Sequence, residues 1–189
     1  MSTGTLPDHD GHAVAGRAER RWAWVVAGIV ALLLVVMVAT GLHWGAMPPS
    51  RVETVDARTL HIRGEFVEPN LGTTVGPDGA VTVRLVAQQY SFTPSCLVVP
   101  AGVPVTFRGT ASDAVHGFIV GRTNANVMLI PGYVATFTAT FPQPGEMLMP
   151  CHEYCGTGHE GMWARVRVLD AREFMQQAQA GKAMSCVAR

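Results

Sequence analysis

An uncharged apolar run near the amino terminus limits the possible folds of this chain more than any other feature. From Trp22 to Trp44 the sequence has no Asp, Glu, Lys or Arg, and a helix of this length crosses the hydrocarbon core of a bilayer. Its tryptophans lie near the two ends, where indole rings favour the headgroup boundary. A cleaved signal peptide is the alternative, but the run is longer than an ordinary signal core and a polar stretch precedes it. We expect a single-pass transmembrane helix at 22–44.

The charges that flank this run predict its orientation. Arg17, Arg20 and Arg21 crowd the amino-terminal side, whereas the other side has no basic residue before Arg51. The positive-inside rule therefore places 1–21 in the cytoplasm, as a tail that we expect to be disordered. In a bacterium, the rest of the chain then lies on the periplasmic, outer side of the plasma (inner) membrane. Thiols survive there mainly as disulfides or as metal ligands.

The outer part of the chain shows the pattern of an all-β domain. Short runs rich in Val, Thr and aromatic residues end at Gly or Pro, which is typical of strands. The candidate strands are 81–90, 96–100, 103–109, 116–121, 134–141, 145–151 and 164–169. Their number and spacing favour a small β-sandwich or Greek-key barrel.

The segments on either side of these strands divide the rest of the chain. We expect a linker at 45–80, a β-domain at 81–170, and a carboxy-terminal helix and tail at 171–189. The helix is predicted because Asp170 and Glu173 resemble a capping box. Acidic and basic residues balance at 14 each, so no charge excess points to a nucleic-acid partner.

Soft metal ligands are concentrated in one short segment. Residues 151–162 read CHEYCGTGHEGM, which spaces Cys151, Cys155, His159 and Met162 as C-x-x-x-C-x-x-x-H-x-x-M. Thiolate, imidazole and thioether ligands suit copper, and two cysteines can bridge two copper ions. Structural zinc is the main competing metal, although a Met at a fixed offset has no role there. A disulfide between the two cysteines is a further alternative, but it leaves the His and Met unexplained.

A copper site of this type also takes a histidine from an earlier strand. His116, in SDAVHGF, begins an apolar run well upstream of the cysteines. We therefore predict His116 as a further ligand.

Three stretches together resemble subunit II of the haem-copper oxidases: SDAVHGF, NVMLIPG and FPQPGEMLMPCHEYCGTGHEGMWARVRV. The resemblance spans about residues 81–170 and implies a cupredoxin-like fold. It implies a binuclear copper centre (CuA) with bridging and terminal ligands, a weak axial thioether and one main-chain oxygen. The implied ligands are bridging Cys151 and Cys155, terminal His116 and His159, axial Met162, and the main-chain oxygen of Glu153. The single anchor is similar to that of the B-type oxidases.

The resemblance also implies a function. Such a subunit accepts an electron from a soluble donor, cytochrome c or a small copper protein. It passes the electron to haem in subunit I, where oxygen is reduced. In many members the carboxylate that matches Glu153 also binds magnesium or manganese at the boundary with subunit I.

Other functions remain possible from the sequence. The chain could belong to a nitric oxide reductase with the same copper centre, or it could be a membrane-tethered copper-binding or copper-delivery protein. Quinol oxidase subunits share the fold but lack the copper ligands that are present here. Cys96 and Cys186 lie outside the ligand pattern, and we hypothesise a disulfide between them, which requires Cα atoms within about 7 Å.

Overall fold

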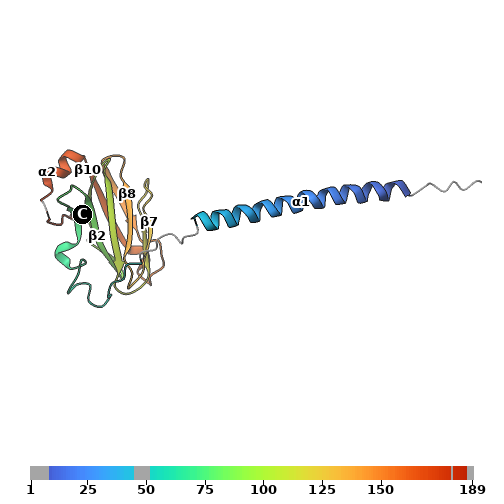
Figure 1. Cartoon of the computed structure of the whole chain (residues 1–189). Helices are drawn as coiled ribbons and strands as arrows, with labels where there is room; N and C mark the ends of the chain where they lie inside the picture. The colour runs from blue at the N-terminus through green and yellow to red at the C-terminus, as the bar shows by residue number, and fades with distance from the viewer. Residues whose placement is uncertain (1–8, 45–51, 180, 187–189) are drawn as a thin grey trace, which may run out of the picture. The chain divides into compact units, whose positions relative to one another are not determined.

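The chain forms two units. The computed structural model describes residues 9–44, 52–179 and 181–186. One unit contains helix α1 (His9–Trp44), and the other, which begins at Val52, contains all the strands and helix α2 (Figure 1).

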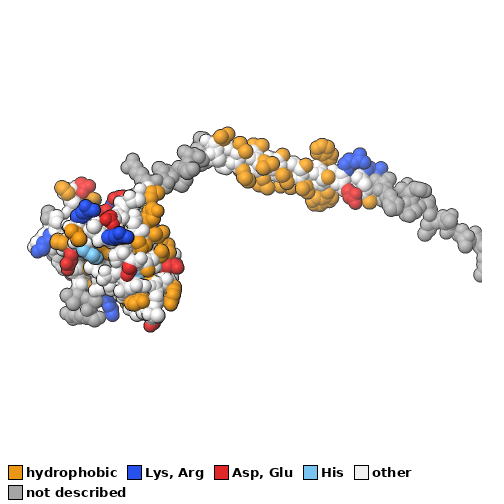
Figure 2. All heavy atoms as spheres, turned by 90° about the horizontal axis from the view of Figure 1, so that it is seen from below, with side chains coloured by type: hydrophobic (Ala, Val, Ile, Leu, Met, Phe, Trp, Pro, Cys, Tyr) orange, Lys and Arg blue, Asp and Glu red, His pale blue; other side chains and the backbone are white. Residues whose placement is uncertain are grey.

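Helix α1 has the composition of a membrane span. Within its stretch Ala15–Leu42, the most apolar window of 18 residues has a mean hydropathy of 2.8, and none of that window is buried. Figure 2 shows hydrophobic side chains along the helix and charged side chains near one end. The predicted anchor is thus a helix, but it begins at His9 instead of Trp22. The expectation of a disordered tail is wrong for the residues from His9 to Arg21, where alanine, arginine and glutamate favour helix; residues 1–8 lie outside the described residues.

The outer unit is a β-sandwich of two main sheets. The larger sheet has the order β1-β2-β5-β8, with β3 also paired to β2, and the smaller sheet has the order β4-β10-β9; β6 and β7 form a separate pair. Their bounds are β1 Gly72–Val75, β2 Val81–Gln88, β3 Ser91–Thr93, β4 Cys96–Pro100, β5 Pro104–Ala111, β6 His116–Ile119, β7 Asn126–Leu129, β8 Ala135–Thr140, β9 Gly145–Pro150 and β10 Trp163–Leu169. The β2–β5 and β4–β10 pairs are parallel, and the others are antiparallel.

Alternating strands explain how the two sheets bury one core. In β2 the side chains of Val81, Val83 and Leu85 are buried, while the residues between them are partly exposed. Such alternation places every second side chain on the inner face of a sheet. Aromatic rings fill the interior, and Phe107 lies stacked on Phe137 with ring centroids 5.0 Å apart. Each fully buried side chain of this size stabilises the fold by roughly 1.5–3 kcal/mol.

The segment predicted as a linker, 45–80, is largely part of the domain. A small second core there includes Leu60, Phe66 and Leu71. Glu65 accepts hydrogen bonds from Arg84 and Arg108 of the adjacent strands β2 and β5. Although burial alone would raise the pKa of Glu65, the hydrogen bonds and charges of these two arginines hold it below its usual value. The ordered domain therefore starts at Val52; residues 45–51 lie outside the described part of the chain.

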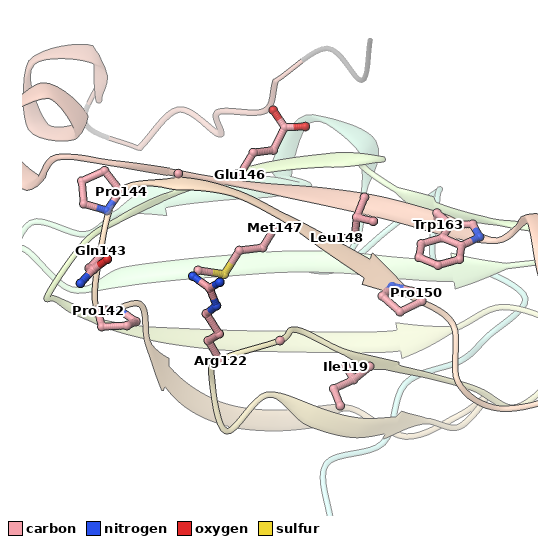
Figure 3. Close-up of a pocket in the computed structure, with 12 residues that line it drawn as sticks. Ile119, Arg122, Pro142, Gln143, Pro144, Glu146, Met147, Leu148, Pro150 and Trp163 are labelled. Atoms are coloured by element: carbon pink, nitrogen blue, oxygen red, sulfur yellow. The ribbon is translucent and has the colours of Figure 1, made fainter.

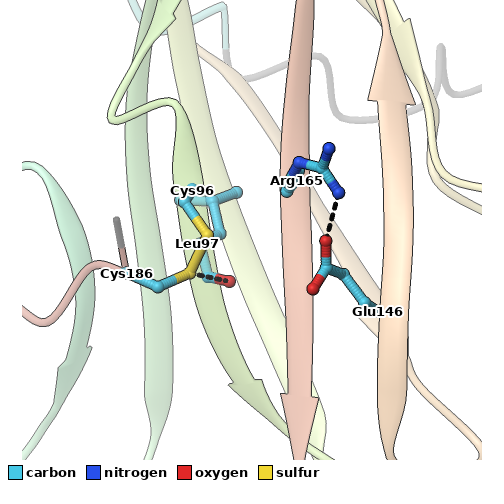
Figure 4. The surroundings of a disulfide bond; sticks show 5 residues. All are labelled: Cys96, Leu97, Glu146, Arg165 and Cys186. Atoms are coloured by element: carbon cyan, nitrogen blue, oxygen red, sulfur yellow. Dashed lines mark hydrogen bonds and ion pairs between the residues drawn. A yellow bond between two sulfur atoms is a disulfide. The ribbon is translucent and has the colours of Figure 1, made fainter. Parts of the chain in front are cut away.

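The carboxy-terminal segment is held against the domain at two places. Asp170 is the N-cap of helix α2 (Ala171–Gln177), and its side chain accepts a hydrogen bond from the Arg172 amide. The helix buries Phe174. The hypothesised disulfide is present between Cys96 and Cys186, with Cα atoms 4.9 Å apart (Figure 4). It joins the tail to the buried strand β4.

Candidate metal centre

His116, the first residue of β6, is completely buried. Its Nε2 lies 2.9 Å from Asp113 Oδ1. Burial would raise the pKa of Asp113, but hydrogen bonds from the Gln89 amide, from His116 and from the Ala114 amide lower it, so this side chain is a carboxylate. A carboxylate only accepts, and His116 Nε2 must therefore carry the proton and donate.

This tautomer leaves a lone pair on the other ring nitrogen. His116 Nδ1 is buried and has no hydrogen-bond partner among the described residues. A buried polar atom without a partner is costly. An imidazole fixed by a carboxylate with its second nitrogen free is the usual arrangement of a metal ligand.

The cysteine segment connects β9 to β10. Its two ends are fastened to each other, because the Cys151 amide donates to the Met162 carbonyl at 3.0 Å. Cys151 also forms an isolated bridge with Phe118 of β6, and the His152 amide donates to the Gly117 carbonyl at 3.0 Å. The segment, which includes the short 3-10 helix His159–Gly161, is therefore held beside the strand that begins with His116.

The predicted side-chain ligands converge on one small volume. One donor atom each from His116, Cys151 and Cys155 lie within 4.8 Å of one another. The two Sγ atoms are 4.0 Å apart, and Cys155 Sγ is 3.6 Å from His159 Nδ1 and 3.7 Å from Met162 Sδ. The structure thus brings these five side chains together from β6 and the β9–β10 segment.

Glu153 contributes its main chain to the same volume. The Cys151 thiol lies 3.3 Å from the Glu153 carbonyl oxygen, to which it donates. The only cluster of three His, Cys, Asp or Glu donors within residues 9–44, 52–179 and 181–186 is that of His116, Cys151 and Cys155. The Glu153 carboxylate is therefore not part of a cation site formed by the described chain alone.

The two cysteines are free thiols. Burial, together with the nearby Cys151, raises the pKa of the Cys155 thiol to about 11. In the absence of metal the thiol therefore keeps its proton at neutral pH. The alternative of a Cys151–Cys155 disulfide does not describe this structure.

The donor set fits copper. It has two thiols, one thioether and two imidazoles, of which the imidazole of His159 is partly exposed and the others are buried. Soft sulfur donors select copper, and deprotonated thiolates are the ligand form. The partnerless Nδ1 of His116 independently supports a metal at this place.

Two supporting residues were missed by the sequence analysis. Asp113 precedes His116 by three residues, and an acid so close to a candidate ligand could have been noticed. The side chain of Gln89 donates a hydrogen bond to the Cys155 carbonyl oxygen. The sequence gave no sign of this contact, because the two residues are 66 positions apart.

An apolar hollow of about 660 Å³ lies beside the centre, not over it. Ile119, Leu148, Pro150 and Trp163 line it together with Arg122 and the loop before β9 (Figure 3). No predicted ligand lines the hollow. Trp163 follows Met162 directly, and its indole Nε1 donates to the Glu160 carbonyl at 2.7 Å, so the ring has a fixed place at the rim.

A β-sandwich that presents one buried histidine and a Cys-Cys-His-Met segment at the same place defines a cupredoxin-like copper domain. Comparison with known families narrows this class. The sequence profile of the family "Cytochrome C oxidase subunit II, periplasmic domain" matches residues 82–169. The chain belongs to the cytochrome c oxidase subunit II family.

Similar proteins support this assignment. The chain is 31% identical over 165 residues to cytochrome c oxidase subunit 2 of Thermus thermophilus, which covers 86% of this chain and 98% of the relative. It is 33% identical over 171 residues to haem-copper oxidase subunit 2 of Aeropyrum pernix, covering 89% of this chain and 66% of the relative. A chain of a haem-copper terminal oxidase dimer, solved by cryo-electron microscopy, is similar with a TM-score of 0.50 and 25% identity, over 78% of this chain and 99% of that chain.

These findings confirm the resemblance inferred from the sequence. The protein is a membrane-anchored subunit of a cytochrome c oxidase, and its β-sandwich is the domain through which electrons enter that enzyme. The alternatives of a nitric oxide reductase subunit and a copper-delivery protein gain no support.

Proposed function

We propose that this chain holds a binuclear copper centre and relays electrons through it. The proposed ligands are the side chains of His116, Cys151, Cys155, His159 and Met162 and the main-chain oxygen of Glu153. The observation that supports this most strongly is the convergence of donor atoms from His116, Cys151 and Cys155 within 4.8 Å. A second thiol has no use in a site for one copper, whereas two thiolates can bridge two ions.

The two histidines support two metal positions. His159 Nδ1 lies beside Cys155 Sγ at 3.6 Å, while His116 belongs to the cluster that also contains Cys151. Each imidazole can therefore serve as the terminal ligand of one of the two copper ions. When bound, the copper pair supplies a one-electron redox couple shared over two metals and two sulfurs.

The protein's part is to hold the ligands still. Four of the five side-chain ligands are buried, and the segment that carries the cysteines is fastened at both ends. Electron transfer is fast when bonds and surrounding dipoles change little, so a rigid, dry site lowers the reorganisation that accompanies each transfer. Hydrogen bonds to the ligands then set the potential.

We propose a soluble donor and a membrane-bound acceptor. Cytochrome c or a small copper protein gives the electron, and haem in subunit I receives it for oxygen reduction. Exposed aromatic groups next to the ligands support contacts of this kind: Tyr154 and Trp163 are 73% and 49% exposed. Interfaces are enriched in tyrosine and tryptophan. No nucleic acid is part of the proposal.

We propose that α1 crosses the plasma (inner) membrane with its amino terminus in the cytoplasm and the copper domain on the periplasmic side. Arg17, Arg20 and Arg21 support this orientation through the positive-inside rule. A protease added to intact spheroplasts should remove the β-domain and spare the amino terminus. The opposite pattern of cleavage would contradict the orientation.

The Glu153 carboxylate is proposed as a ligand for magnesium or manganese at the boundary with subunit I. Because the described chain forms no such cluster there, the other ligands must come from the partner. The assembled oxidase, grown with manganese, should contain one Mn²⁺ that Glu153→Gln removes while the copper content stays the same. Unchanged manganese in the variant would refute this role.

Copper stoichiometry tests the proposed function. The folded full chain in detergent, loaded with copper and free of other metals, should bind two copper ions and show an electron paramagnetic resonance pattern of one electron shared between them. Cys151→Ser and Cys155→Ser should each abolish the shared pattern, while Ser95→Ala, outside the centre, should leave it unchanged. A blue single-copper spectrum, or preferential tight binding of zinc without colour, would contradict the proposal.

A further inference from the structure

Gln89 connects the two parts of the chain that supply the proposed ligands. It lies between β2 and β3, far from both parts in the sequence. Its main-chain N–H donates to Asp113 Oδ2 at 2.8 Å, and its side-chain Nε2 donates to the carbonyl oxygen of Cys155. One residue thus contacts the support of one ligand and the main chain of another.

The hydrogen bond from Gln89 to Asp113 acts indirectly on His116. Asp113 uses its other oxygen, Oδ1, for His116 Nε2 at 2.9 Å. The Gln89 amide therefore fixes the carboxylate that fixes the imidazole. Because the free Nδ1 of His116 must point at the thiols, a rotation of this carboxylate would turn the lone pair away from them.

The hydrogen bond from the Gln89 side chain acts directly on the cysteine segment. The Cys155 carbonyl is a main-chain group of the residue whose Sγ lies between Cys151, His159 and Met162. Holding this carbonyl restricts the peptide plane after Cys155 and so the direction of its side chain. The two contacts of Gln89 join residues 66 and 24 positions apart, so no local structure supplies the same constraint.

The neighbouring Tyr90 packs on the same segment. Its ring lies so close to Gly158 that a Cβ there would be 2.6–2.9 Å from the ring atoms, and its hydroxyl lies 3.3 Å from Thr157 Oγ1. Gly156, with φ +135, is likewise in contact with both Tyr90 and Gln89. The cysteine segment therefore packs against the β2–β3 connection and is also held there by the hydrogen bond from Gln89.

We infer that Gln89 is a positioning residue of the copper centre, which sets the placement of Cys155 relative to His116 through its two N–H groups. This inference rests on the proposed copper function. The contribution of the Gln89 side chain can be tested separately, because a substitution removes the hydrogen bond to Cys155 and leaves the main-chain hydrogen bond to Asp113. Gln89 is exposed, so its replacement leaves no cavity in the core.

The test compares Gln89→Met with Gln88→Met in the full chain in detergent. Methionine matches the length of glutamine and has no N–H donor. Gln88 lies next to Gln89 in the sequence, is partly exposed at the end of β2, and makes no side-chain hydrogen bond recorded among the described residues. Copper affinity is measured by competition with a chelator, and the electron paramagnetic resonance spectrum and the thermal midpoint of the metal-free protein are recorded alongside.

Loss of an outer hydrogen-bond partner typically costs 10–100-fold in metal affinity. We expect about tenfold weaker copper binding and an altered hyperfine pattern for Gln89→Met, with wild-type values for Gln88→Met and similar metal-free midpoints for both. Gln89→Asn, which is one methylene too short to reach the carbonyl, should behave like Gln89→Met and provides a second test if the first variant fails to fold.

Equal affinity and equal spectra for Gln89→Met and Gln88→Met, with two coppers bound to the wild type, would overturn this inference and leave the proposed function intact. Full affinity in Gln89→Asn would overturn it as well. A wild-type chain that binds one copper or none would overturn both, and the two failures are thereby distinguished.

Discussion

Removal of the Cys96–Cys186 disulfide should destabilise the β-domain by several kcal/mol. The bond joins residues 90 positions apart, so it restricts most of the domain in the unfolded state. The chain-entropy relation for a loop of this length gives about 4.6 kcal/mol at 25 °C, and native disulfides typically contribute 2–5 kcal/mol. We therefore expect Cys96→Ala/Cys186→Ala to lower the free energy of unfolding by about 2–5 kcal/mol.

Urea denaturation of the metal-free full chain, followed by circular dichroism of the β-domain, measures this loss. Alanine is chosen because Cys96 is buried and a serine hydroxyl there would need a partner. Wild-type protein treated with a reductant is the matched control and should lose a similar amount, because Cys151 and Cys155 are already free thiols. A loss below about 1 kcal/mol would refute the reasoning that the loop is open in the unfolded state.

Three further predictions concern single side chains. Asp113→Asn weakens the constraint on the tautomer of His116, so copper affinity in chelator competition should fall by about 10–100-fold; an unchanged affinity would contradict the role of the carboxylate. Gly117→Ala places a Cβ 2.4 Å from the His152 ring and should lower the free energy of unfolding by about 1–3 kcal/mol, a loss that a second change, His152→Ala, should largely restore. Glu65→Gln should lower the free energy of unfolding by about 1–3 kcal/mol at neutral pH, since it breaks a partly buried ion pair. Because the pKa of Glu65 is lowered in the folded state, the ion pair stabilises the fold above the unfolded pKa of about 4.3, and this stabilisation should vanish as the pH falls through the folded pKa. A difference between variant and wild type that persists at low pH would contradict the ionic origin.

Four of the five proposed side-chain ligands could be picked out from the sequence because their spacing is local. Cys151, Cys155, His159 and Met162 follow one another on a short segment, so no tertiary structure is needed to see the pattern. His116 lies on another strand, and its prediction required the rule that a copper site of this type also takes a histidine from an earlier strand. The structure brings all five together as expected.

The positions of the longer strands could also be predicted, whereas three of the short ones could not. The alternation follows directly from valine and leucine at every second position in β2 and from alanine and valine in β10. β1, β3 and β7 were missed, since three or four residues carry too little periodicity. The segment 52–71 was predicted as linker because its buried residues, Leu60 and Phe66, are widely spaced and separated by polar residues.

Long-range supports escaped the sequence analysis for a different reason. The bonds of Gln89 to Asp113 and to Cys155 join residues that no pattern connects. Glutamine on an exposed turn is ordinary in any sequence. Only the fold shows that this residue meets both ligand-bearing parts of the chain.

The central claim is that two copper ions share the thiolates of Cys151 and Cys155. Diffraction from crystals of the copper-loaded full chain, measured at the copper absorption edge, locates the ions directly. Two anomalous peaks are expected beside the two sulfurs, one next to His116 and the other next to His159. A single peak, or copper bound away from these residues, would contradict it.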